Sequence, residues 1–208
     1  MSDGSRSDYF AVFGLPRRLV MDVPALEREF YARSRRLHPD RFAAKPVEEQ
    51  EQALKASSEL NDAYRTLKEP IARTAHLLGL EGVELEEQSK AATEAARASG
   101  GAKKQVAPPE LLEEAFELNM QLEEMQAAKR FGDNDPQLRK DLEAARTNFE
   151  GMLLATQTEL EALWAQWDAA LAAGDAAAKV SVRDAMVALL NRRSYVRNLV
   201  RDVNEALE

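Results

Sequence analysis

The chain contains two histidines, and one of them has a neighbour with which it could transfer a proton. His38 lies two residues before Asp40 in the stretch SRRLHPDRF, with Pro39 between them. A histidine beside a carboxylate can act as a general base when a nucleophile and a closed pocket accompany it. The same spacing also fits a helix end, where a histidine interacts with the last carbonyl groups. A third interpretation is a surface that contacts another protein.

The flanking sequence predicts that this triplet forms a turn between two helices. Asp22 is expected to cap the first helix, with Pro24 in its first turn. That helix must end near Leu37, because the residue before a proline disfavours helical backbone. The second helix is predicted over residues 46–67 and stops before Pro70. An exposed turn is a poor place to exclude water, which disfavours catalysis.

The rest of the sequence gives little support to an enzyme. There is no cysteine, which excludes disulfides, thiolate nucleophiles and cysteine-ligated metals. The two histidines are far apart, and neither a G-x-S-x-G motif nor a glycine-rich loop occurs. We therefore expect a protein that is not an enzyme and that holds no cofactor and no metal.

Composition favours an all-α fold. The 208 residues are 45% hydrophobic and 31% charged, with abundant Ala, Leu, Glu, Arg and Gln and with 9 Gly and 8 Pro. The N-terminus lacks the apolar run of a signal sequence, and no segment reaches the roughly 18 apolar residues of a membrane span. The expectations are a cytoplasmic location and no membrane partner.

Charge is distributed unevenly along the chain. Residues 1–80 carry 13 Lys and Arg against 12 Asp and Glu, whereas residues 81–208 carry 15 against 24. The acidic second part argues against nucleic acid as a partner. Residues 28–45 form a local basic patch with a net charge of +4, which suits an acidic protein surface.

Helical periodicity predicts how the first part packs. Asp8 is expected to cap a short helix that Pro16 ends, and residues 70–80 form another short amphipathic helix. The apolar faces of the two longer helices are expected to pack together, with a polar gap at Arg33 or Ser34. These faces consist of Val23, Leu26, Phe30 and Leu37 on the first, and Leu54, Leu60, Ala63, Tyr64 and Leu67 on the second.

The sequence divides into a domain over residues 1–80, a linker or insertion over 81–107, and a domain over 108–208. Residues 88–107 contain almost no large apolar residue, which predicts a linker or an alanine-rich helix that frays over residues 89–98. The second domain is predicted to be an antiparallel three-helix bundle. Its two tryptophans, Trp164 and Trp167, are expected in the bundle core.

The helix PPELLEEAFELNMQLEEMQ, residues 108–126, carries two apolar stripes. Leu111, Ala115, Leu118, Leu122 and Met125 follow the 4, 3, 4, 3 spacing of a bundle seam. Leu112, Phe116 and Met120 lie about 100° to 180° around the helix from that seam. This second stripe either packs against the N-terminal domain or another helix, or forms an exposed patch that binds a partner.

The first 80 residues resemble a J domain. An arginine-rich helix, His38-Pro39-Asp40 and a helix carrying ELNDAYRTLKEP occur in that order over residues 8–80. The resemblance implies that His38, Pro39 and Asp40 contact a DnaK/HscA-class chaperone and stimulate its ATP hydrolysis. Arg35, Arg36 and Arg41 match the basic positions that dock on the chaperone.

Nearly the whole chain is similar to the HscB family of iron–sulfur-cluster co-chaperones. DYFAVFGLP, HPDRF and LNDAYRTLKEPIARTAHLLGL carry this similarity, followed by a helical bundle. In that family the bundle binds an IscU-type scaffold. The resemblance implies a scaffold-binding surface formed by Leu112, Phe116, Glu117, Met120, Glu124 and Tyr195.

Three positions depart from the family pattern. Arg33 stands where a core leucine is usual, so either its stem covers the core or the hairpin packs more loosely there. Glu113 stands at an apolar position, and Met120 at a position that often holds glutamate. Tyr195 has a second interpretation as a half-buried bundle tyrosine.

The sequence therefore predicts a co-chaperone that grips an iron–sulfur scaffold through its bundle and activates the chaperone ATPase through its J domain. An alternative is a general J-domain co-chaperone with a different client. A hydrolase that uses His38 and Asp40, and a helical adaptor in which His38 has no role, are more distant alternatives.

Overall fold

The computed structural model describes residues 7–83, 85, 108–132 and 135–208. The linker predicted over residues 88–107 lies outside these residues. Throughout the described ranges the chain forms helices and no strand, which confirms the all-α fold. None of the described helices combines the length and the apolar character that crossing a membrane would require.

The helices pack into two compact units that are not continuous in sequence. Unit 1 comprises Met1–Glu84 and Leu163–Arg183, and unit 2 comprises Leu85–Ala162 and Asp184–Glu208. Residues 163–183, which the sequence assigns to the C-terminal bundle, thus pack with the N-terminal segment.

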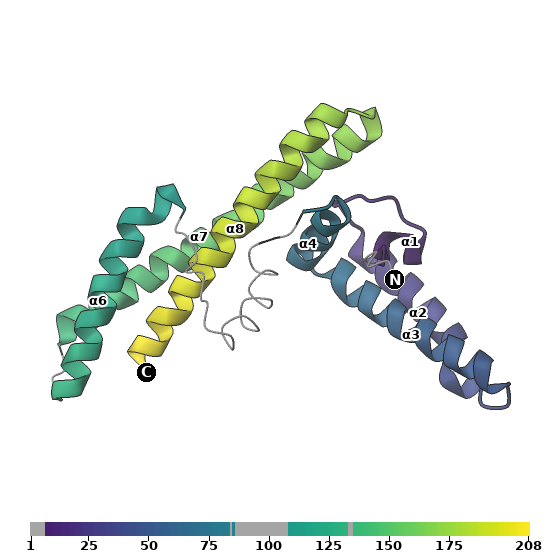
Figure 1. The fold of residues 1–208 in the computed structure, drawn as a ribbon, viewed down its shortest axis with the longest axis horizontal. Helices are drawn as coiled ribbons and strands as arrows, with labels where there is room; N and C mark the ends of the chain where they lie inside the picture. The colour runs from purple at the N-terminus through teal and green to yellow at the C-terminus, as the bar shows by residue number, and fades with distance from the viewer. Residues whose placement is uncertain (1–6, 84, 86–107, 133–134) are drawn as a thin grey trace, which may run out of the picture. The chain divides into compact units, whose positions relative to one another are not determined.

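Unit 1 contains a helical hairpin with short helices around it (Figure 1). Its N-terminal elements are α1 (Tyr9–Phe13), α2 (Val23–Leu37), a 3₁₀ turn (Pro39–Arg41), α3 (Val47–Lys68) and α4 (Pro70–Leu80). As predicted, Asp8 caps α1, and Asp22 caps α2 by accepting a 2.9 Å hydrogen bond from the Ala25 amide.

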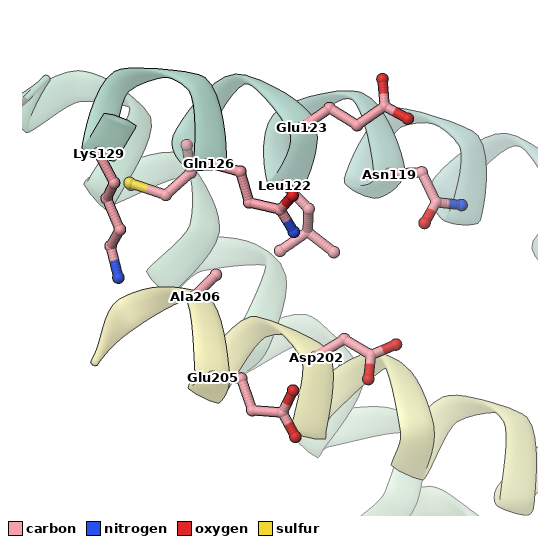
Figure 2. A pocket seen from close by; sticks show the side chains of 9 residues that line it. Asn119, Leu122, Glu123, Gln126, Lys129, Asp202, Glu205 and Ala206 are labelled. Carbon is pink, nitrogen blue, oxygen red and sulfur yellow. The ribbon is translucent and has the colours of Figure 1, made fainter. Parts of the chain in front are cut away.

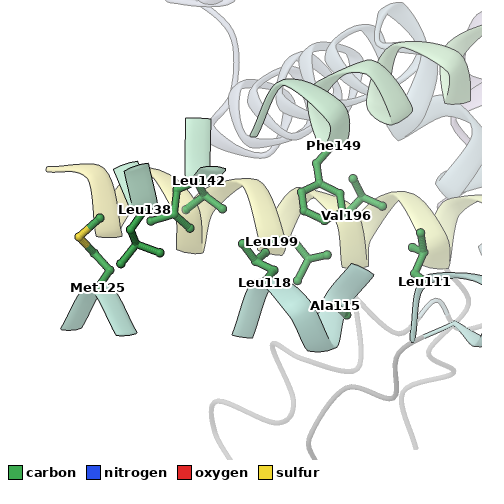
Figure 3. Packing of buried hydrophobic residues seen from close by; sticks show 10 residues of the cluster. Leu111, Ala115, Leu118, Met125, Leu138, Leu142, Phe149, Val196 and Leu199 are labelled. Carbon is green, nitrogen blue, oxygen red and sulfur yellow. The ribbon is translucent and has the colours of Figure 1, made fainter. Parts of the chain in front are cut away.

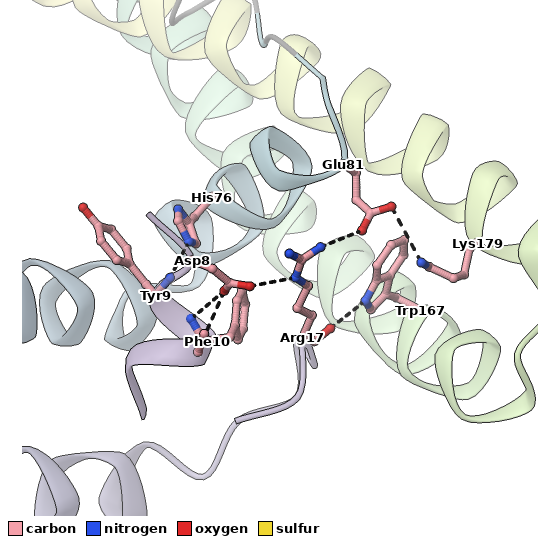
Figure 4. Close-up of polar contacts among 9 residues, drawn as sticks. Asp8, Tyr9, Phe10, Arg17, His76, Glu81, Trp167 and Lys179 are labelled. Carbon is pink, nitrogen blue, oxygen red and sulfur yellow. Dashed lines mark hydrogen bonds and ion pairs between the residues drawn. The ribbon is translucent and has the colours of Figure 1, made fainter. Parts of the chain in front are cut away.

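Every backbone amide in the first turn of α1 has an acceptor. The Asp8 carboxylate accepts from Phe10 and Ala11, and the Asp8 carbonyl accepts from Val12. The remaining amide, that of Tyr9, donates to Nε2 of His76 in α4 at 3.1 Å (Figure 4). His76 also stacks on the Tyr9 ring and is buried, so this second histidine holds the start of the fold together.

The two arms of the hairpin pack largely as the periodicity predicts. The buried apolar side chains at this interface are Leu26, Ala53, Leu60, Ala63 and Leu67. The prediction for Leu54 was wrong, because this side chain is 62% exposed and Ala53 is buried in its place. Ala53 precedes Leu60 by seven residues, which is two helical turns, whereas Leu54 is rotated by about 100° from that line.

The tryptophans pack inside unit 1, not in the bundle core where the sequence placed them. Trp167 donates through Nε1 to the Arg17 carbonyl at 3.0 Å, and Trp164 donates to the Thr74 hydroxyl at 2.9 Å. Asp168 accepts from the amides of Leu19 and Val20 at 2.8 and 3.1 Å. Residues 164, 167 and 168, which share one side of α7 at i, i+3 and i+4 spacing, therefore bind the segment that joins α1 to α2 and the start of α4.

A chain of charged groups adds to the same packing (Figure 4). Arg17 pairs with Asp8 at 3.0 Å and with Glu81 at 3.6 Å, and Glu81 also pairs with Lys179 at 3.6 Å. The Lys179 ammonium lies 4.9 Å from the centre of the Trp167 ring, which is a cation–π contact.

Unit 2 holds a 3₁₀ turn (Pro109–Leu111), helix α6 (Leu112–Phe131), residues 136–162 of α7 (Pro136–Ala173) and residues 184–207 of α8 (Ala176–Leu207). The helix ends coincide with glycine and capping aspartate residues. Gly132 follows α6 with φ of 71°, in the left-handed conformation that suits glycine. Asp135 caps the start of α7, and Asp175 caps the start of α8.

The core of unit 2 is formed by side chains from all three helices (Figure 3). The seam predicted on α6 is confirmed, since Leu111, Ala115, Leu118 and Met125 are buried and Leu122 packs against them. The other buried members are Leu138, Leu142, Phe149, Val196, Leu199 and Val203. These contacts leave the opposite face of α6 outside the core.

Candidate functional site

The His-Pro-Asp triplet forms the turn at one end of the hairpin, as predicted. His38 is the residue that caps the C-terminal end of α2, and Pro39, Asp40 and Arg41 make a single 3₁₀ turn. The Arg41 amide donates to the His38 carbonyl at 3.0 Å, and the Phe42 amide donates to the Pro39 carbonyl at 2.9 Å. The turn is therefore held by its own backbone.

The imidazole of His38 faces the residue that the sequence pairs with it. Its Nδ1 atom lies 3.4 Å from the Asp40 amide nitrogen and 3.4 Å from the Asp40 carboxylate. When Nδ1 accepts from the amide, the proton of a neutral imidazole is on Nε2, which remains a donor for a partner. This contact orders the histidine within the turn.

The setting of the pair is unsuited to general-base chemistry. The side chains of His38 and Asp40 are 58% and 88% exposed. Water therefore reaches both groups, and a pair this exposed lacks the closed environment in which catalytic groups act. Elsewhere in the described part of the chain, no group of three His, Cys, Asp or Glu side chains could hold a metal ion.

The predicted docking arginines surround this turn. Arg35 and Arg36 lie in the last turn of α2, Arg41 lies in the 3₁₀ turn, and all three are exposed. Arg35 donates to the Tyr31 carbonyl at 3.2 Å, one helical turn earlier. Together with His38, Pro39 and Asp40, they form the exposed end of the hairpin, which we call the basic tip.

One contact that the sequence did not predict supports the basic tip. The Gln50 side chain, in the first turns of α3, donates to the Lys45 carbonyl at 2.8 Å and so braces the loop after the turn. Further along, the rings of Phe30 and Tyr64 stack at 4.1 Å, and the Tyr64 hydroxyl donates to Glu27 at 3.1 Å. Partial burial and this bond to the Glu27 carboxylate raise the pKa of Tyr64.

Arg33 also lies in α2, but its side chain points to the end of α1 and not to the basic tip. It donates to the carbonyls of Val12 and Phe13 and pairs with Glu29 at 2.6 Å. Its guanidinium lies 5.5 Å from the centre of the Phe13 ring. The charged group itself is thus engaged at the end of α1, and Arg33 does not extend the basic tip.

The second apolar stripe of α6 is exposed on unit 2. Leu112, Phe116 and Met120 are 55%, 66% and 58% exposed, and Glu117 and Glu124 beside them are exposed as well. We call these three apolar residues the outer stripe. An apolar row next to carboxylates on a helix surface is the pattern of a partner-binding patch, not of a bundle core.

Tyr195 is placed differently from the other predicted scaffold contacts. It is half-buried and packs against the core of unit 2. Burial, together with the nearby Asp202 carboxylate, raises the pKa of its hydroxyl. Its position matches the half-buried bundle tyrosine of the sequence analysis, and its contribution to a scaffold surface stays a prediction.

Comparisons with known proteins agree with one another, although no family model matches the chain. It is 37% identical over 89 residues to a co-chaperone protein HscB homolog of Chromobacterium violaceum, which covers 43% of this chain and 51% of that protein. It is 41% identical over 78 residues to co-chaperone protein HscB of Proteus mirabilis, which covers 38% and 45%. These matches thus span about half the length of those curated relatives.

Two solved structures are similar over most of the chain. Chaperone HscB from Vibrio cholerae has a TM-score of 0.57 at 26% identity, with 96% of both chains covered. Human co-chaperone protein HscB also has a TM-score of 0.57, at 22% identity, with 98% of this chain and 83% of that chain covered. The human structure supports the fold.

Proposed function

The chain belongs to the HscB family, and on that premise we propose that it is a J-domain co-chaperone of iron–sulfur cluster assembly. In this proposal the basic tip stimulates ATP hydrolysis by an HscA/DnaK-class chaperone. The outer stripe, with Glu117 and Glu124, binds an IscU-type scaffold. The protein itself carries out no bond chemistry.

The observation that carries the proposal is the exposed basic tip. His38, Pro39 and Asp40 are ordered by local hydrogen bonds and yet open to solvent. Arg36 and Arg41 form no ion pair with any acid of the described residues, so their charges are free for an acidic partner surface. An ordered turn suits protein recognition because binding orders few additional groups, and unpaired cations beside it suit an acidic partner surface.

The outer stripe supports the client half of the proposal. Exposed apolar side chains contribute most to binding when a partner excludes water around them, and polar residues commonly form the rim. Phe116 lies between Leu112 and Met120 on one line of α6, which makes it the expected centre of the contact.

The test is the steady-state ATPase rate of a DnaK-class chaperone from the same organism, measured with and without this protein. We expect stimulation by the wild type and a return to the basal rate with His38→Gln. Lys55→Gln is the matched control, since Lys55 is an exposed residue of α3 away from the turn. It should stimulate as the wild type does.

The outcomes separate the alternatives. Full stimulation by His38→Gln would exclude the role given to the turn. If the wild type stimulates the ATPase but does not bind an IscU-type scaffold, and the scaffold does not change the rate, the protein is a general J-domain co-chaperone with a different client. Substrate turnover with no chaperone present would favour the hydrolase.

A further inference from the structure

A groove of about 720 Å³ lies between α6 and α8 in unit 2 (Figure 2). Leu122 and Met125 of α6 and Ala206 of α8 give it an apolar lining. Each of these three residues also contacts the bundle core, so this apolar surface is fixed by the packing of the bundle. A helix of a partner can insert aliphatic side chains into such a surface.

The edges of the groove are mainly acidic. Glu123 of α6 and Asp202 and Glu205 of α8 line it, whereas the cation in its lining is Lys129, near the end of α6. Arg201 bonds to Asp202 at 2.8 Å and lies 3.6 Å from Glu205, but all these groups are near the surface. A cationic side chain of a partner can therefore approach the carboxylates without a large desolvation cost.

The polar lining argues against a small-molecule site. Asn119, Glu123, Gln126, Lys129 and Glu205 are exposed, and Asp202 is half-buried. A pocket for a small ligand normally has convergent polar groups that are shielded from water and fix the ligand's orientation. A macromolecular segment needs no such enclosure.

The groove adjoins the outer stripe. Glu123 follows Met120 by three residues and Phe116 by seven, so the three share one side of α6. Asn119 lies one helical turn before Glu123 and also lines the groove. A partner that covers the outer stripe therefore meets the acidic edge of the groove next.

We propose that this groove binds a basic amphipathic helical segment of the client protein. The proposal rests on the proposed function and extends its client surface from α6 to α8. Aliphatic side chains of the segment contact Leu122, Met125 and Ala206, and its Lys or Arg side chains pair with Glu123, Asp202 and Glu205. Like-charge repulsion from this edge disfavours an acidic segment.

The first experiment uses the full chain and a defined probe. The probe is a fluorescent amphipathic peptide of roughly three helical turns, with leucines on one face flanked by lysines. Its control is the same peptide with glutamates in place of the lysines. By fluorescence anisotropy we expect saturable binding of the basic peptide that weakens as salt is added, and no binding of the acidic one.

Variants locate the binding. Glu205→Lys reverses a charge at the groove, and Ala206→Phe fills its apolar lining. Each should weaken binding of the basic peptide on the order of tenfold. Glu150→Lys makes the same charge change at an exposed site of α7 outside the groove and should bind as the wild type does. Circular dichroism checks that each variant is folded.

The outcomes distinguish this proposal from the proposed function. Absence of peptide binding, or equal weakening of peptide binding by Glu150→Lys and Glu205→Lys, would overturn the proposal that the groove binds a basic helix. The variants are then titrated with an IscU-type scaffold. Weakening by Phe116→Ala with none by Glu205→Lys would also overturn the groove and leave the proposed function standing. Absence of scaffold binding to the wild type would overturn the proposed function, and the groove is then decided by the peptide result.

Discussion

Arg33 completes the hydrogen bonding at the end of α1. The last four backbone carbonyls of an α-helix have no hydrogen-bond donor within the helix. In α1, the Phe10 and Ala11 carbonyls accept from the amides of Leu15 and Gly14. The Val12 and Phe13 carbonyls accept from the forked guanidinium of Arg33. A leucine, which the family pattern favours at this position, would leave these two carbonyls to water.

Replacing Arg33 tests this role. We expect Arg33→Ala to lower the free energy of unfolding by about 1 to 2 kcal/mol, because two part-buried carbonyls lose a charged donor. Arg33→Lys should fall between the wild type and the alanine variant, since an ammonium cannot reach both carbonyls in a fixed fork. Urea unfolding measures the difference. Equal midpoints for all three proteins would contradict the role.

For single residues, the sequence predicts those contacts that form between close neighbours in the chain. The His-Pro-Asp turn and the caps at Asp8 and Asp22 follow from rules that span a few residues, and the structure has them. The hydrogen bonds of Arg33 could not be predicted from such local rules, because the carbonyls that accept them lie 20 and 21 residues away in sequence. Periodicity marks Arg33 as a gap in the apolar face, and only the packed helices show what fills it.

At the scale of the element, α6 has two apolar rows with different environments. Its seam residues are buried in the bundle, whereas the outer stripe is exposed. A helix that serves only as a bundle member would have polar residues on its outer face. The two rows can therefore be separated by mutation, since one contributes to folding and the other is available for binding.

Three truncations make this separation measurable. Phe116→Ala should weaken scaffold binding by roughly tenfold or more while the free energy of unfolding changes by less than about 0.5 kcal/mol. Leu118→Ala should instead lower the free energy of unfolding by about 2 to 5 kcal/mol, because it opens a cavity in the core. Leu154→Ala removes another exposed apolar side chain, on α7, and should change neither quantity.

Calorimetric titration and urea unfolding measure the two effects. A large loss of stability in Phe116→Ala would return the outer stripe to a packing role. Equal loss of binding in Phe116→Ala and Leu154→Ala would show that the contact is not specific to α6.

The buried face of a helix was predictable wherever the row of apolar residues was continuous. Leu111, Ala115, Leu118 and Met125 form such a row and are buried. In α3 the row is weaker, and the larger Leu54 drew the prediction away from Ala53, which is the buried residue. Hydrophobicity alone could not tell which of the two adjacent residues is buried, because the opposing surface of α2 decides which position is covered.

At the scale of the whole molecule, the compact units depend on contacts that no local pattern reveals. Trp164 and Trp167 recur at helical spacing and look like bundle core, yet their hydrogen-bond partners are Thr74 and Arg17. These partners are 90 and 150 residues away in sequence. A fragment of residues 105–208 would therefore lack part of unit 1, and binding experiments require the full chain.

Asp168 offers a sharp test of how unit 1 is assembled. Its two carboxylate oxygens accept from the Leu19 and Val20 amides, so each amide depends on one side chain from α7. We expect Asp168→Ala to destabilise unit 1 by about 1 to 3 kcal/mol, because a charged acceptor is lost to both amides. Asp168→Asn should cost less, since its single carbonyl oxygen still accepts.

Hydrogen exchange on the full chain reports this contact directly. The Leu19 and Val20 amides should exchange faster in the order wild type, Asp168→Asn, Asp168→Ala, while the amides of α6 keep their rates because they belong to unit 2. Glu150→Ala removes an exposed carboxylate of α7 in unit 2 and should leave Leu19 and Val20 unchanged. Unchanged exchange at both amides in Asp168→Ala would mean that unit 1 holds its α1–α2 segment without α7.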